Sequence, residues 1–216
     1  MLICSIVCAS GISDSQVDSL RKKLSVHFSE RVNLQLRESV LGKSLLVHLL
    51  NEHFGIRDFY VDCTKNGKPY LRDSNIHFNI SHCNDYILCV CGYENVGCDI
   101  EAVRPYNEKV SRRFFSVNEY NALCLSENPE VDFMRMWTLK ESALKFSGEG
   151  ISGGLDLWDF SEYYNYETFR LKGLRFTCRE SRNLIISICS TDDEILEIKT
   201  DINKMFDLKG ENYEYN

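Results

Sequence analysis

The sequence contains little proline and no long apolar segment. Only 3 of the 216 residues are proline and 12 are glycine, which excludes collagen-like repeats and linker-type compositions. The first eleven residues are apolar, but they lack the basic start and the cleavage site of a signal peptide and are shorter than the ~20 residues that cross a bilayer. We therefore expect a cytoplasmic protein that does not bind membranes.

Positive charge is scarce as well. The chain has 25 lysines and arginines against 32 aspartates and glutamates, so that its formal net charge is −7. Proteins that bind phosphate backbones without sequence preference carry a surplus of basic residues. We therefore expect no binding to nucleic acid.

The ten cysteines lack the spacing of a metal site. No C-x-x-C pair occurs, so a zinc ribbon would be without its ligands. Because the number is even, the disulfide framework of a secreted protein is one alternative. Most of the cysteines, however, lie in apolar runs such as YILCVCGY at 86–93, where a free cysteine packs as a small hydrophobic residue. We expect reduced core cysteines, as in a reducing cytosol.

Apolar residues, which make up 44% of the chain, follow patterns of mixed period and are numerous enough to form a core. Ser13–Asp14 is a good helix start, and Asn66–Gly67 predicts a turn. Helices are predicted at 14–26, 35–53, 107–113, 117–126 and 130–147. Strands are predicted at 2–9, 59–63, 76–81, 85–92, 95–101, 169–180, 183–190 and 194–200, those at 76–81, 85–92 and 95–101 being successive antiparallel neighbours.

Helices and strands are segregated in this order rather than alternating as β-α-β units, which indicates an α+β fold. Arg104–Pro105 is the best candidate boundary between two halves, 1–104 and 105–216. The last six residues, ENYEYN, are expected to be frayed.

Two carboxylates share a strand face in Gly97-Cys98-Asp99-Ile100-Glu101. Because side chains alternate along a strand, Asp99 and Glu101 point to the same side, about 7 Å apart. Neighbouring carboxylates repel each other unless a cation or a proton lies between them. Oxygen ligands of this kind suit Mg²⁺, although a solvated strand face is the alternative for this pair alone.

A second cluster lies on a predicted helix. Trp137, Glu141 and Lys145 are each four residues apart and therefore share one helix face. Taken alone, this pattern is equally typical of an exposed Glu–Lys pair beside a core tryptophan. A third cluster, Ser116-x-x-Glu119, has the spacing of a capping box, in which Glu119 reaches back to the Ser116 amide.

These clusters occur in order with two further segments. The series GKPY (67–70), FNISH (78–82), VGCDIE (96–101), RFFSVNEY (113–120) and WTLKESALKFSGEG (137–150) resembles the 4′-phosphopantetheinyl transferases, specifically the longer surfactin-synthetase type. The resemblance is close over about residues 60–152 and loose in the N-terminal helices. It implies a monomer of two similar α/β halves, packed in pseudo-twofold fashion with the site at their interface.

The activity implied by this resemblance is the transfer of the phosphopantetheine arm of coenzyme A to a serine hydroxyl of an acyl or peptidyl carrier protein. Asp99, Glu101 and Glu141 match the family's Mg²⁺ carboxylates, and Lys145 matches the lysine that contacts the diphosphate. Glu119 and Glu141 are both candidates for the general base. The positions that match contacts to coenzyme A are Ser81, His82, Lys68 and, in the N-terminal region, Arg37, with Arg31 and Lys43 as alternatives.

The negative net charge makes long-range attraction of an acidic carrier protein weak, so docking is expected to depend on a local patch. Lys109, Arg112 and Arg113 are candidates for part of this patch, with an ordinary solvated helix face as the alternative. Two other functions remain open at this point. One is a Mg²⁺-dependent nucleotide diphosphate hydrolase, and the other is a non-catalytic domain that binds carrier proteins.

Overall fold

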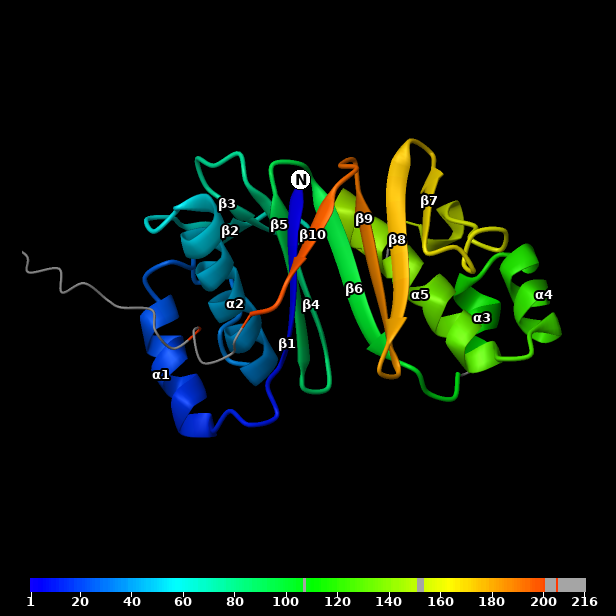
Figure 1. Ribbon diagram of the computed structural model, residues 1–216, viewed down its shortest axis with the longest axis horizontal. Coiled ribbons are helices and arrows are strands. Elements are labelled where there is room, and N and C mark those ends of the chain that lie inside the picture. Colours follow the sequence, from blue (N-terminus) through cyan, green and yellow to red (C-terminus); the bar gives the residue numbers. More distant parts are fainter. Residues whose placement is uncertain (107, 151–153, 201–204, 206–216) are drawn as a thin grey trace, which may run out of the picture.

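The computed structural model describes residues 1–106, 108–150, 154–200 and 205. Within these residues the fold is α+β, as predicted, with helices gathered at the two ends of the molecule and strands between them (Figure 1). None of the described helices combines the length and the apolar composition needed to cross a membrane. The predicted frayed tail, ENYEYN, lies outside the described residues.

The first sheet has four strands and is covered on one face by two helices. Helix α1 (Asp14–Leu24) begins with a capping box between Ser13 and Gln16, and α2 (Arg37–Phe54) ends where Gly55 adopts a left-handed φ of 66°. Both helices bury leucines and valines in one core with β1 and β5. In pairing order, the strands are β10 (Ile195–Ile198), β1 (Leu2–Cys8), β5 (Tyr86–Gly92) and β4 (His77–Cys83).

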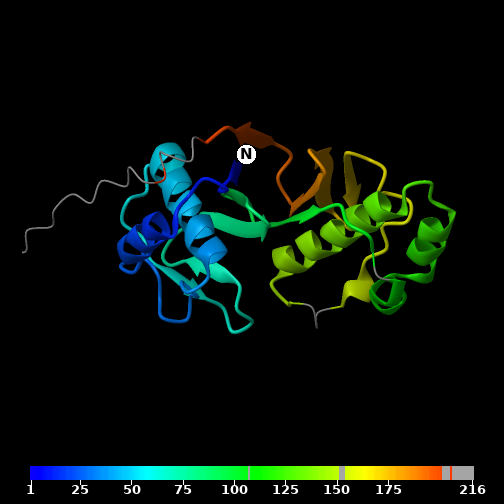
Figure 2. The ribbon, with the colours of Figure 1, turned by 90° about the horizontal axis from the view of Figure 1, so that it is seen from below.

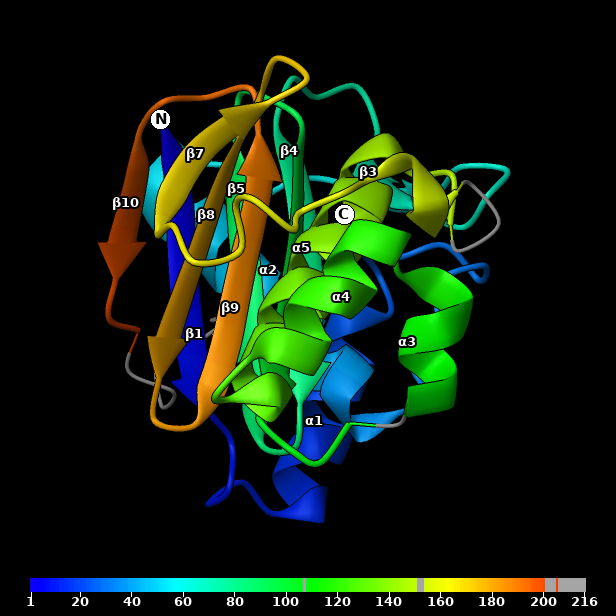
Figure 3. The same ribbon diagram turned by 90° about the vertical axis from the view of Figure 1, so that its right-hand side faces the viewer.

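The second sheet also has four strands, and the long helix α5 lies across one face of it (Figure 3). Helix α5 (Pro129–Ser147) starts with proline in its first turn, where the missing amide donor is harmless, and ends before Gly148, which has a left-handed φ of 74°. In pairing order, the strands are β6 (Val96–Ala102), β9 (Leu184–Ser190), β8 (Leu174–Ser181) and β7 (Thr168–Leu171).

Smaller elements complete the two ends of the molecule. A short hairpin of β2 (Val61–Cys63) and β3 (Pro69–Leu71) turns at Gly67, as Asn66–Gly67 predicted. At the other end, α3 (Glu108–Phe114) and α4 (Val117–Leu125) precede α5, and a 3-10 turn (Leu155–Leu157) follows it. An aromatic cluster that includes Phe133, Trp137 and Phe160 fills the space between these elements.

Strands cross the predicted boundary at Arg104–Pro105 in both directions. β6 was expected to pair with its neighbour β5, but it pairs with β9 of the second sheet instead. β10, which comes last in the chain, pairs in parallel with β1 of the first sheet. The predicted strand at 169–180 is in fact a hairpin of β7 and β8, because Lys172 and Gly173 both have positive φ and turn the chain.

The faces of the two sheets that point away from the helices meet in a third core, which joins the halves. It includes Cys4 and Leu88 from the first sheet and Cys98, Ile100 and Ile188 from the second. In Figure 2 the strands of both sheets are seen between the helices of the two ends. All ten cysteines are free, and seven of them are buried, which agrees with the expected role as core residues.

Candidate functional site

The two sheets meet where β4 lies beside β6, and side chains rather than a backbone ladder join these strands. The Asn79 side-chain oxygen accepts a hydrogen bond from the Cys98 amide at 2.8 Å. The Cys83 sulfur accepts one from the Ala102 amide at 3.2 Å. Because these bonds link positions at both ends of β6, the strand is held along its length. We call this junction the β4–β6 seam.

Helix α5 lies unusually close to β6 at Gly97. A Cβ atom at this position would lie 2.0 Å from the Ser142 carbonyl oxygen and 2.3 Å from the Phe146 amide nitrogen. Such distances are far below van der Waals contact, so only glycine allows this approach. Gly97 therefore has a structural role. It allows the helix that bears Glu141 and Lys145 to pack against the strand that bears Asp99 and Glu101.

Asp99 is the centre of the seam. It is 4% exposed, and its Oδ1 accepts hydrogen bonds from the Ser81 hydroxyl at 2.8 Å and from the Lys145 ammonium at 2.6 Å. Lys145 also donates to the Ser81 oxygen at 3.0 Å. Strand β4, strand β6 and helix α5 thus each contribute one side chain to a single polar cluster. The other carboxylate oxygen of Asp99, Oδ2, is buried and has no hydrogen-bond partner among the described residues.

The negative charge of Asp99 acts on both Glu101 and Glu141. Burial raises the pKa of each carboxyl, and the negative charge of Asp99 raises it further. Burial opposes the charge on Lys145, but Asp99 beside it raises the lysine pKa above its ordinary value. Three carboxylates therefore share this region with the Lys145 ammonium and with the Arg104 guanidinium, which lies 3.3 Å from Glu101, so that negative charge is in excess by one.

The acidic side chains at the seam are of the kind that binds a divalent cation, because all three offer hard oxygen ligands. In addition, Asp99 Oδ2 accepts no hydrogen bond from the described residues. The three side chains are not gathered into a ready metal cluster, however. In the described part of the chain, no three acidic, histidine or cysteine side chains are arranged so that they could hold a metal ion. The position nearest to Asp99 Oδ1 is taken by the Lys145 ammonium.

Glu119 lies apart from this cluster, in a second and fully buried ion pair. Its Oε2 accepts from the Ser116 amide at 2.7 Å, which completes the predicted capping box of α4, and lies 2.9 Å from the Lys140 ammonium. Its Oε1 accepts from the Phe160 amide at 3.0 Å. Both charged side chains are 0% exposed. These contacts of Glu119 cap α4 and bind it to α5 and to the segment after the 3-10 turn, which is a structural role.

Lys140 had no role in the sequence reasoning, although it lies inside the WTLKE motif. It donates to the Leu155 carbonyl at 2.8 Å and to the Trp158 carbonyl, in addition to its ion pair. The signal that could have revealed it is helical spacing, because residue 140 is one turn after Met136 and one turn before Leu144, and both of these are buried. A lysine in such a stripe requires a buried anion.

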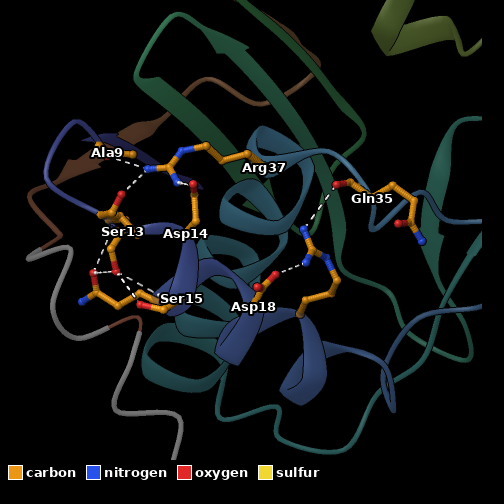
Figure 4. Close-up of polar contacts among 10 residues, drawn as sticks. Ala9, Ser13, Asp14, Ser15, Asp18, Gln35 and Arg37 are labelled. Atoms are coloured by element: carbon orange, nitrogen blue, oxygen red, sulfur yellow. Dashed lines mark hydrogen bonds and ion pairs between the residues drawn. The ribbon is translucent and has the colours of Figure 1, made fainter.

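Arg37 lies at the start of α2 and holds the loop between β1 and α1. Figure 4 shows its guanidinium directed at Asp14, to which it donates at 3.0 Å, and at the Ala9 carbonyl at 3.4 Å. It also donates to the Ile12 carbonyl. The two alternatives differ: Arg31 is exposed, whereas Lys43 is largely buried and donates to the Asn33 carbonyl at 2.9 Å. Burial lowers the pKa of Lys43 to about 8.

Lys68, just before β3, and His82, on β4, differ in their surroundings. The Lys68 ammonium donates to the Asn95 side chain at 2.9 Å and to the carbonyls of Val96 and Phe146 at 3.3 and 2.8 Å, so all three of its protons are used within the protein. His82 is exposed and, because it follows Ser81 on a strand, points to the opposite face. The structure brings Ser81, Asp99 and Lys145 together but does not bring Lys68 or Arg37 into hydrogen-bond contact with them.

Comparison with known proteins adds an independent observation. The model of the 4′-phosphopantetheinyl transferase superfamily matches residues 95–193. This range contains β6, α5 and the seam residues Asp99, Glu101, Glu141 and Lys145. The matched range also extends through β8 and β9. The similarity to the family therefore reaches beyond residue 152, where the sequence analysis placed the end of the close resemblance.

Three bacterial proteins show the same similarity. Psf-1 of Bacillus pumilus, a 4′-phosphopantetheinyl transferase, is 34% identical over 130 residues, which are 58% of this chain and 56% of that protein. The 4′-phosphopantetheinyl transferase ffp of Bacillus subtilis is 30% identical over 166 residues, or 72% and 74%. The 4′-phosphopantetheinyl transferase Sfp of Bacillus subtilis strain 168 is 32% identical over 123 residues, or 55% and 55%. The chain thus matches little more than half the length of psf-1 and Sfp and about three quarters of ffp.

Proposed function

Because the chain belongs to the 4′-phosphopantetheinyl transferase family, we propose that it transfers the phosphopantetheine arm of coenzyme A to a serine hydroxyl of an acyl or peptidyl carrier protein. In this reaction the serine oxygen forms a bond to the phosphate that bears the arm. The bond between that phosphate and the next one breaks, and adenosine 3′,5′-bisphosphate leaves. The observation that supports this most strongly is the polar cluster of Ser81, Asp99 and Lys145, of which Asp99 and Lys145 lie within the range that the family model matches.

Asp99, Glu101 and Glu141 are the residues that would hold Mg²⁺. Support for this comes from Asp99 Oδ2, which has no partner among the described residues, and from the raised pKa values of the two glutamates, since a cation relieves the repulsion among one buried and two half-buried carboxylates. When bound, Mg²⁺ supplies charge neutralisation to a diphosphate. Lys145 would then exchange its bond to Asp99 for a bond to the departing phosphate oxygen and stabilise the charge that develops there.

The serine hydroxyl must lose a proton as it attacks. Glu141 is better suited than Glu119 to accept it, because Glu141 lies at the seam and is partly exposed, whereas both oxygens of Glu119 are occupied in a buried pair.

Coenzyme A would approach the seam from β4. Ser81 is already part of the cluster, and the exposed His82 has an imidazole that a phosphate could reach. Lys68 and Arg37 could act as phosphate contacts only if they gave up bonds within the protein, so Ser81 and His82 are the stronger candidates. The two halves would be related by a pseudo-twofold axis, which is supported by one long helix, α2 or α5, against each four-stranded sheet.

A carrier protein would dock near α3. Arg112 lies over the ring of Tyr120 and pairs with Glu108 at 2.7 Å, and Arg113 lies over Phe114, which gives basic groups next to aromatic ones. We further propose a location in the cytoplasm, on the basis of the ten unpaired cysteines, and a monomer, as the resemblance implies.

The direct test is to incubate the purified protein with coenzyme A, Mg²⁺ and an apo-carrier protein and to measure the intact mass of the carrier. We expect a gain of one phosphopantetheine per carrier, and none when the acceptor serine is replaced by alanine. If several carriers that a control transferase modifies keep their mass, the proposal fails.

The same assay separates the two alternative functions. Release of adenosine 3′,5′-bisphosphate from coenzyme A without any carrier would indicate a hydrolase. Saturable binding of the carrier without a gain in mass would indicate a non-catalytic binding domain.

A further inference from the structure

A cavity lies on the side of the second sheet that faces away from α5. Its volume is about 300 Å³, and it is lined by residues of β1 and β10 from the first sheet and of β8 and β9 from the second. The pairing register separates it from the seam: Asp99 pairs with Ser187 on the α5 face, whereas Cys98 pairs with Ile188 and Ile188 with Thr177 on the cavity face. The cavity is therefore distinct from the transferase site, with the thickness of a sheet between them.

Two polar atoms in the wall of this cavity have no partner. The Thr177 hydroxyl and the Nε of Arg175 are both buried and make no hydrogen bond to the described residues. Thr177 as a whole is only 6% exposed. Leaving such groups unpaired is costly, so two neighbouring ones in the wall of a cavity point to a ligand that accepts hydrogen bonds.

Each charged side chain around the cavity has an oppositely charged partner. Arg179 forms an ion pair with Glu197, and Glu180 lies 3.9 Å from Arg135. The terminal nitrogen of Arg175 donates to the Asp193 carbonyl and lies 3.7 Å from the Asp193 carboxylate. The Nε proton of Arg175 and the Thr177 hydroxyl are the two buried donors of the wall that have no partner among the described residues.

Apart from these polar residues, Cys4 and Ser181, the wall is aliphatic. Ile6 and Ile195 come from the first sheet, and Ile186 and Ile188 come from the second. From the ~30 Å³ that one water molecule occupies in the liquid, the cavity has room for about ten non-hydrogen atoms. We propose that this cavity binds a small aliphatic carboxylate, whose oxygens accept from Arg175 Nε and Thr177 Oγ1 and whose chain contacts the four isoleucines.

Hexanoate, which has about eight non-hydrogen atoms, is a suitable probe, with an affinity in the millimolar range expected for its size. We would titrate it into the full chain labelled with ¹³C at the isoleucine δ1 methyl groups. We expect saturable changes in the methyl NMR chemical shifts of the four isoleucines that line the cavity, Ile6, Ile186, Ile188 and Ile195. No change is expected for Ile12, which lies in the core of the first half. Hexylamine, which has the same chain but an ammonium head, should not produce these shifts.

Two variants test the polar contacts. Thr177→Val keeps the shape and removes only a hydroxyl without a partner, so the fold should be retained while the dissociation constant for hexanoate rises about tenfold. Arg175→Lys keeps the charge but removes the Nε donor, and should weaken binding by a similar factor. The inference is overturned if the shifts do not saturate, if hexylamine reproduces them, or if neither variant changes the dissociation constant. None of these results depends on transferase activity.

Discussion

Helix α5 contributes to two lysine–carboxylate pairs that lie only five residues apart and differ in almost every other respect. Lys140 and Glu119 are fully buried, and both oxygens of Glu119 are occupied. Lys145 and Asp99 lie at the seam, with the lysine 30% exposed and one oxygen of Asp99 without a partner. The distances are similar, at 2.9 and 2.6 Å, so proximity alone does not distinguish their roles.

The difference shows that a structural pair and a functional pair are distinguished by whether both carboxylate oxygens already accept hydrogen bonds within the protein. A buried carboxylate whose two oxygens both accept from groups of the protein, as in Glu119, holds elements together. Asp99 has one oxygen without a partner among the described residues and lies near other negative charges. The electrostatic repulsion among these charges is unfavourable, and a bound cation would relieve it. The sequence pattern contains both carboxylates, and only their surroundings assign the roles.

The largest effect on stability is expected from breaking the buried pair. Lys140→Met removes the cation and leaves Glu119 buried without it, which should lower the free energy of unfolding by about 3–5 kcal/mol. Urea denaturation followed by circular dichroism measures this. The double variant Lys140→Met/Glu119→Gln should recover part of the loss, and full additivity of the two single effects would contradict the pairing.

The next effect concerns the close approach that forms the seam. Gly97→Ala places a methyl group within 2.3 Å of the backbone of α5, so the helix must move, at a cost of about 1–3 kcal/mol or more. The melting temperature and the rate of transfer should both fall. Gly11→Ala is the matched control, because nothing lies within 4 Å of the added methyl group. Equal melting temperatures for the two variants would show that α5 does not lie against Gly97.

The smallest effect concerns Lys68, a third buried lysine, which binds the end of α5. Burial lowers its pKa from 10.5 to about 8, so between these values the unfolded chain binds more protons than the folded one. Stability should therefore rise with pH from about 8 to 10.5, and the penalty for the buried charge is complete below pH 8. Allowing for solvent screening of a partly exposed group, the gain should be about 1 kcal/mol.

Lys68→Met should remove this contribution. The test is the difference between the stability curves of the parent and the variant, since Lys43 and other groups titrate over the same range. A difference that does not change between pH 8 and 10.5 would contradict the lowered pKa of Lys68.

Local features were predictable from the sequence, and long-range pairings were not. The helix start at Ser13, the capping box of Ser116 and the extent of α2 and α5 follow from short-range spacing, and each was found within a few residues of its prediction. The pairing of β6 with β9 and of β10 with β1 was missed. Alternation along a strand indicates which side chains share a face, but it does not identify the strand that lies beside it.

The candidate site was predictable to a similar degree. The shared face of Asp99 and Glu101 follows from strand geometry, and their contact with Lys145 required the approach of α5 at Gly97. The role of Glu119 could not be assigned from spacing, because its partner Lys140 lies 21 positions away on another helix.

The most direct test of this account is to measure, for Asp99→Asn, both the mass gain of an apo-carrier protein and the free energy of unfolding. Asparagine still accepts from Ser81 and Lys145 but has no negative charge. We predict a loss of transfer of about a thousandfold or more, as when a charged group at a transition state is removed, with stability close to that of the parent. Transfer at the parent rate, with Mg²⁺ present, would contradict the assignment of the seam as the catalytic site.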